Sequence, residues 1–128
     1  MHRHLSWKRI VVFSLGVFLV ISLRGALAQD DASLDSLIVC KDTQRLIFEN
    51  TFVRIIDDVI PPGAAEGRHR HPHGVVVTLA EADVETVNAA GRTTKGRTRI
   101  GAGWNEPTVH EVRNVGTTPT HWIRIDLK

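Results

Sequence analysis

The sequence contains one cysteine, Cys40, among its 128 residues. A single thiol cannot form an internal disulfide, so a fold held together by disulfides is excluded. Cys40 is better explained as a small buried apolar side chain than as a reactive thiol. The sequence also lacks internal repeats, low-complexity tracts and, after residue 37, any convincing helical period, which favours a single β-type domain.

An apolar run long enough to span a membrane is also missing. The longest run, residues 10–23, has 14 residues, whereas a spanning helix needs roughly 20. The run follows a basic start and precedes the small residues of segment 26–28, which is the layout of a secretory signal. We therefore expect residues 1–28 to be a signal peptide, the rest of the chain to be periplasmic or secreted, and no stable membrane span to remain after cleavage. Arg24, directly behind the run, leaves an uncleaved anchor as the alternative.

Basic residues are not in excess once this segment is removed. Four of the sixteen Lys and Arg residues lie in residues 1–28 and none of the fourteen Asp and Glu residues do, so the remainder carries 12 minus 14, or −2. This charge gives no reason to expect nucleic acid as a partner. The remaining 100 residues suffice for one domain but not for two. We divide the chain into the signal peptide, a lead-in segment (29–44) and one domain (45–128).

What the domain does contain is a series of short β-type runs. Runs such as "RLIF", "TFVRIIDDVI" and "HWIRIDL" recur about every ten residues and are separated by Gly, Pro and Asn. This pattern predicts an all-β fold, either an antiparallel sandwich or a barrel.

The segment "GRHRHPHGVVV", residues 67–77, places three histidines at alternate positions. Side chains alternate across a strand, so an extended chain would put the histidines on the same face as the apolar residues that follow. Pro72 and Gly74 are the positions where a bend would interrupt this row. The row would consist of His69, His71, His73, Val75, Val77 and Leu79.

Several imidazoles that point into an apolar interior need partners there. Each unsatisfied buried polar group costs roughly 1–3 kcal/mol, and a divalent ion removes that cost by accepting the lone pairs. In "TVHEVRN" the residues that share a face are Thr108, His110 and Val112, and His110 becomes a candidate ligand because of the upstream cluster. The alternative is a histidine-rich loop that binds metal loosely and without a role.

Two segments resemble the motifs of the cupin family, commonly written G-x5-H-x-H-x3,4-E-x6-G and G-x5-P-x-G-x2-H-x3-N. "PPGAAEGRHRH" resembles the first, with five residues between Gly63 and His69, and "NEPTVHEVRN" resembles the second, with three residues between His110 and Asn114. The resemblance covers about residues 45–128 and is closest to small single-domain bacterial cupins. It implies an antiparallel jelly-roll barrel.

The chain departs from the family at the acidic ligand of the first motif, because Val75 and Val76 occupy its places. The resemblance implies that one divalent metal is held by His69, His71 and His110. His73 either replaces the missing carboxylate as a further ligand or lies at the rim of the pocket. A register in which His71 and His73 are the paired ligands is the alternative.

An all-nitrogen site with an open position suits Zn, Fe, Cu, Ni or Mn better than Mg or Ca. Such an ion can polarise a carbonyl, activate water or bind oxygen, so a dioxygenase-like or isomerase-like enzyme acting on a small molecule is one hypothesis. The catalytic residues are unknown. Glu66 and Glu106, expected in loops beside the ligands, are the only carboxylates we nominate as a base. A non-catalytic module that binds or senses a small ligand or metal is the alternative, and a homodimer is a candidate because many cupins are dimers.

Overall fold

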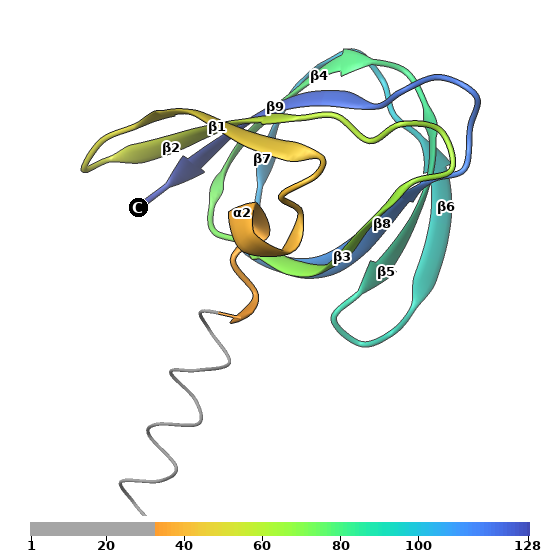
Figure 1. Ribbon diagram of the computed structural model, residues 1–128, viewed down its shortest axis with the longest axis horizontal. Helices are drawn as coiled ribbons and strands as arrows, with labels where there is room; N and C mark the ends of the chain where they lie inside the picture. The colour runs from red at the N-terminus through yellow and green to blue at the C-terminus, as the bar shows by residue number, and fades with distance from the viewer. Residues whose placement is uncertain (1–32) are drawn as a thin grey trace, which may run out of the picture. The chain divides into compact units, whose positions relative to one another are not determined.

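The computed structural model describes residues 33–128, so the expected signal peptide lies outside the described residues. The described part is built almost entirely of β-strands, with a short helix before the first of them (Figure 1). The elements are α2 (Ser36–Val39), β1 (Gln44–Glu49), β2 (Val53–Asp58), β3 (Ala65–His71), β4 (Gly74–Ala80), β5 (Asp83–Asn88), β6 (Thr93–Arg97), β7 (Gly101–Asn105), β8 (Thr108–Asn114) and β9 (His121–Leu127). Among these residues no helix has the length and apolar character needed to cross a membrane.

The strands form two sheets. One has the order β1-β2-β9-β4-β7 and the other β3-β8-β5-β6, and every neighbouring pair is antiparallel. The chain changes sheet at every connection except those between β1 and β2 and between β5 and β6, and the two sheets face each other as two layers (Figure 1). This is a jelly-roll arrangement, and the all-β antiparallel fold expected from the strand spacing is confirmed.

The connection between β3 and β4 corrects one expectation. Only Pro72 and His73 separate these strands, yet the strands belong to different sheets. The turn shifts the alternation by one residue: Val76 and Thr78 line the interior cavity, whereas Leu79 is exposed. The histidines of β3 therefore do not continue into the odd-numbered valines, because proline cannot extend the strand and the chain bends there.

The interior is unusually polar. Among the described residues five apolar side chains are buried, against ten that are polar or charged. Burying so many polar groups opposes stability unless they are paired or serve a site. The buried polar residues are Ser36, Gln44, Asp58, Glu66, His69, His71, Asn114, Thr120, Arg124 and Asp126. The polar interior is therefore the place to look for function.

The lead-in segment is structured where it meets the barrel. The helix α2 packs against β1 and β3, and Asp35 caps its start by accepting a hydrogen bond from the backbone N–H of Leu37 at 2.9 Å. The N–H of Arg70 donates to the carbonyl of Leu34 at 2.8 Å. These contacts hold the lead-in segment against β3, the strand that carries His69 and His71.

Candidate metal centre

Three histidines meet between two paired strands. His69 and His71 lie on β3, His110 lies on β8, and the register sets His69 directly opposite His110. One ring nitrogen from each residue lies within 4.8 Å of the other two. His69 and His71 are fully buried and His110 is half-buried. The structure thus brings together the three residues that the motif resemblance grouped.

The orientation of the His69 ring is set by its own backbone. Its Nδ1 lies 2.7 Å from the carbonyl oxygen of Gly67, and because a carbonyl only accepts, this nitrogen carries the proton. The lone pair of the neutral ring is then on Nε2, which lies 3.1 Å from Nε2 of His110. Two nitrogens bound to one zinc ion at about 2.0–2.1 Å are about 2.8–3.4 Å apart, depending on the coordination angle. The observed separation fits two ligands of one ion.

Burial keeps two of the rings in the form that binds metal. Desolvation lowers the pKa of His71 to about 4, against an opposing contact with Asp126. Burial lowers the pKa of His110 to about 3, and the charges of His69 and Arg124 act in the same direction. Both rings are therefore neutral at pH 7, with lone pairs to donate.

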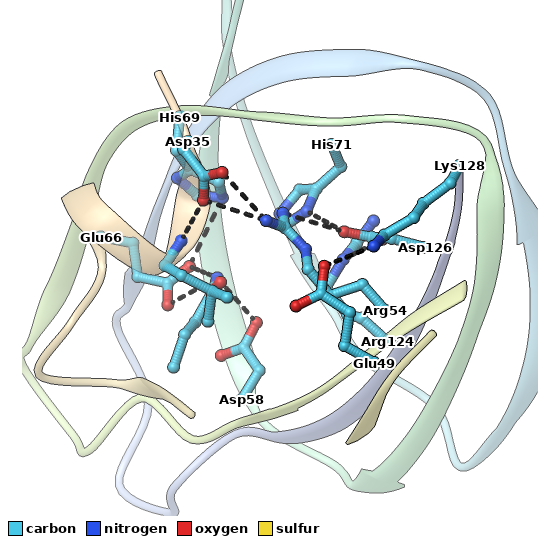
Figure 2. Close-up of polar contacts among 12 residues, drawn as sticks. Asp35, Glu49, Arg54, Asp58, Glu66, His69, His71, Arg124, Asp126 and Lys128 are labelled. Carbon is cyan, nitrogen blue, oxygen red and sulfur yellow. Dashed lines mark hydrogen bonds and ion pairs between the residues drawn. The ribbon is translucent and has the colours of Figure 1, made fainter. Parts of the chain in front are cut away.

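A carboxylate on β9 lies behind His71. Oδ2 of Asp126 is 3.5 Å from Nδ1 of His71 (Figure 2), so Nε2 faces away from this carboxylate. Asp126 is itself flanked by Arg124, whose Nε lies 3.5 Å from Oδ1, and by Arg54, whose Nη2 lies 3.7 Å from Oδ2. Burial opposes ionisation of Asp126, but His71 and Arg124 hold its pKa below the usual value. The charged carboxylate can therefore orient the imidazole.

Glu66, which we expected in a loop, lies inside β3 and is buried. Its Oε2 is 3.6 Å from Nε2 of His69 (Figure 2). The hydroxyl of Thr43 donates to Oε1 at 2.5 Å, and Nε2 of Gln44 donates to both carboxylate oxygens at 3.2 Å. A carboxylate is thus present beside the cluster, three residues before His69 rather than after His71 as in the family motif.

Cys40 is buried, as expected. Its sulfur lies within 4.8 Å of ligand atoms of Glu66 and His69. Burial raises the pKa of the thiol, and the nearby carboxylates of Glu66 and Asp58 raise it further. A thiol that keeps its proton is a poor ligand and a poor nucleophile, so Cys40 acts here as packing.

Asp58 on β2, the second buried carboxyl group near Glu66, is expected to make stability fall as the pH rises. Burial and the charge of Glu66 raise the pKa of Asp58 to about 8. Between about pH 6.5 and 8 the folded protein then holds a proton that the unfolded chain has lost, so the free energy of unfolding falls by up to about 1.4 kcal/mol per pH unit. His71 and His110 act in the opposite direction at the lower end of this range, because the unfolded imidazoles lose their protons near pH 6.5 while the folded ones are already neutral.

Urea unfolding in EDTA across this pH range measures the slope. Asp58→Asn should flatten it, whereas Asp42→Asn, which alters an exposed aspartate, should leave it unchanged. Equal slopes for Asp58→Asn and the unaltered protein would contradict a proton held by Asp58 in the folded state.

His73 does not join the cluster. Its ring stacks on Trp104 with the centroids 5.8 Å apart, and its Nδ1 lies 3.1 Å from Oε2 of Glu106. Nε1 of Trp104 donates to the same carboxylate at 2.8 Å. The side chains of His73 and Glu106 are 54% and 73% exposed. These three residues form a rim cluster, which corresponds to the second of the two positions considered for His73.

A cavity of about 770 Å³ opens beside the histidines. Sequence reasoning did not assign Asp58, Trp122 or Arg124 to a site, although all three line this cavity. In "HWIRIDL" the isoleucines alternate with Trp122 and Arg124, and a rule that puts apolar residues inside predicts the opposite face for the arginine. No local pattern in the sequence reveals that the arginine faces inward, because this orientation depends on the polar cavity between the assembled sheets.

No family model matches the sequence, and no curated protein matches it. Solved structures do. A cupin domain from Bordetella pertussis Tohama I is 25% identical, with a TM-score of 0.60 over 66% of this chain and 91% of that chain. An RmlC-like cupin family protein with a double-stranded β-helix fold from Methanocaldococcus jannaschii is 9% identical, with a TM-score of 0.54 over 66% and 77%.

An enzyme also has this fold. The DMSP lyase DddQ from Ruegeria pomeroyi DSS-3 is 13% identical to the chain, with a TM-score of 0.51 over 69% of this chain and 48% of that chain. At this identity the likeness concerns the fold alone.

Proposed function

The chain belongs to the cupin superfamily, and from this premise we propose that it holds one divalent metal ion through His69, His71 and His110. The observation that carries the proposal is the pair of Nε2 atoms on His69 and His110 that face each other at 3.1 Å. The carbonyl of Gly67 fixes the tautomer of His69, so the lone pair of this ring is on Nε2. Two neutral imidazole lone pairs this close repel unless a proton or a cation lies between them.

The three nitrogens leave coordination positions open toward the cavity, because His71 and His110 also line it. Bound there, Zn, Fe, Cu, Ni or Mn would supply a Lewis acid or a redox centre. The chain's own residues orient the ligands: Gly67 fixes His69 and Asp126 lies behind His71. We propose a reaction of the dioxygenase or isomerase kind on a small molecule that enters the cavity. The lyase with this fold is an example of an enzyme built on it.

Metal content tests the proposal directly. The protein purified without chelator should contain about one equivalent of a first-row transition metal by elemental analysis, since closely spaced neutral imidazoles bind such ions tightly. Less than about a tenth of an equivalent, unchanged after incubation with zinc, iron(II) or copper(II), would exclude a resident metal. Iron or copper favours the dioxygenase-like reaction. Metal without turnover would favour a binding or sensing module.

We further propose that the protein is exported, because residues 1–28 combine a basic start, a 14-residue apolar run and small residues before a polar segment. A homodimer is also proposed, since the edge strand β1 exposes Leu46, Ile47 and Phe48 and edge strands pair readily. Intact and native mass spectrometry of periplasmic and cytoplasmic extracts tests both: a chain found only in the cytoplasm, or a monomer alone, would overturn the corresponding proposal.

A further inference from the structure

One of the polar side chains that line the cavity belongs to a buried arginine. Arg124 lies on β9 between Ile56 of β2 and Val76 of β4 in the register. It is 6% exposed and lines the cavity together with His71 and His110. Figure 2 shows Arg124 among the buried polar groups that surround His71 and Asp126. The five-stranded sheet thus places Arg124 in the same cavity that His71 and His110 line from the four-stranded sheet.

The guanidinium of Arg124 is only partly used by the protein. Its nearest ionic partner, Oδ1 of Asp126, lies 3.5 Å from Nε, which is long for a charge-assisted hydrogen bond. Neither Nε nor Nη2 of Arg124 has a hydrogen-bond partner, although both atoms are buried. A buried donor without an acceptor costs roughly 1–3 kcal/mol, more when it is charged. An arginine in a cavity wall therefore favours a ligand that supplies acceptor oxygens.

The charge of the cavity wall indicates the sign of that ligand. Asp58 keeps its proton at pH 7, so the charged groups of the lining are two arginines, Arg99 and Arg124, and two carboxylates, Glu66 and Glu106. Their formal charges sum to zero, and a divalent ion at the three histidines changes the sum to +2. An anion would lower the charge of the loaded cavity, whereas a neutral molecule would leave it unbalanced.

Resting on the proposed metal site, we propose that Arg124 is the anion-binding residue of this cavity and that the ligand of the protein is a small carboxylate. The carboxylate accepts hydrogen bonds from the guanidinium of Arg124, and the rest of the molecule extends to the ion at His71 and His110. Arginine is suited to this role because its planar donors match the two oxygens of a carboxylate. The volume of about 770 Å³ admits a molecule much larger than the carboxylate group itself.

Lactate and lactamide are the probes, because they have similar size and shape but differ in charge. Calorimetric titration of the full-length, metal-loaded protein should show lactate binding at least about tenfold tighter than lactamide, the effect of roughly 1.4 kcal/mol from one charged interaction. Arg124→Gln should reduce lactate binding to the level of lactamide. Arg99→Gln, which removes an exposed arginine from the same cavity, should change lactate binding by less than about threefold.

The controls separate this proposal from the metal site. A lactate chelate on the ion alone would survive Arg124→Gln, so unchanged lactate binding in that variant overturns the role of Arg124. Equal binding of lactate and lactamide by the unaltered loaded protein overturns the ligand class, even if Arg124→Gln does not fold, which circular dichroism reveals. Loss of lactate binding in Arg99→Gln but not in Arg124→Gln places the anion at the rim instead. If the metal-site proposal itself is wrong, the elemental analysis shows this before any titration with lactate, because the protein then takes up no metal.

Discussion

Replacing His110 with alanine is expected to abolish stoichiometric metal binding while leaving the barrel folded. The change removes one of the two Nε2 atoms that face each other at 3.1 Å and leaves two imidazoles on one strand. Loss of a residue that merely orients a ligand costs about 10–100-fold in metal affinity, so loss of a ligand should cost at least about 100-fold. Competition of the protein with a chromophoric chelator for zinc measures this change.

His73→Ala is the matched control for His110→Ala. His73 is exposed and stacks on Trp104, so its loss should leave zinc affinity within about threefold of the unaltered protein. The alternative register, with His71 and His73 as the paired ligands, predicts a large loss for His73→Ala and little change for His69→Ala. That pattern would move the site to the rim cluster. Thermal melting in EDTA should show that all three variants fold.

The sequence predicts the ligand cluster better than it predicts the surroundings of that cluster. His69 and His71 are recognisable because metal sites need fixed ligand spacings, and local spacing is visible in a sequence. His110 lies far along the chain and is grouped with them by the resemblance of its own segment to the second family motif. His73 shares that spacing, but Pro72 bends the chain into the other sheet. A sheet change of this kind depends on tertiary packing, which local alternation does not encode.

The carboxylates and the arginine illustrate a second limit. Glu66 is recognisable as a nearby acid, but its burial depends on hydrogen bonds from Thr43 and Gln44, about twenty residues upstream. Asp58 and Arg124 contradict the rule that polar residues face water. The rule fails here because the barrel encloses a polar cavity rather than a packed core. Strand recurrence predicted the fold because turns and alternation are local, whereas residues that serve the cavity are recognised only after the sheets are assembled.

Replacing Gly74 with alanine is expected to produce the largest loss of stability of any single change considered. Gly74 begins β4 and lies opposite Asp126 of β9. A Cβ there would collide with the carbonyl oxygen of Ile125 and lie 3.1 Å from its carbon and 3.2 Å from Cα of Asp126. These are backbone atoms of a central strand and cannot rotate away. The expected loss is about 3 kcal/mol, at the upper end for overpacking, or roughly 15 °C in Tm for a domain of this size.

Gly96→Ala is the matched control, because a Cβ at Gly96 on β6 would meet nothing within 4 Å. That variant should melt within about 3 °C of the unaltered protein, since surface changes usually stay within about 0.5 kcal/mol. Gly74→Ala should also weaken zinc binding, because a displaced β9 carries Asp126 away from His71. Scanning calorimetry with and without zinc separates the two effects. An unchanged Tm for Gly74→Ala would show that β4 and β9 are not as closely paired as their register requires, and the orientation of His71 by Asp126 would lose its structural basis.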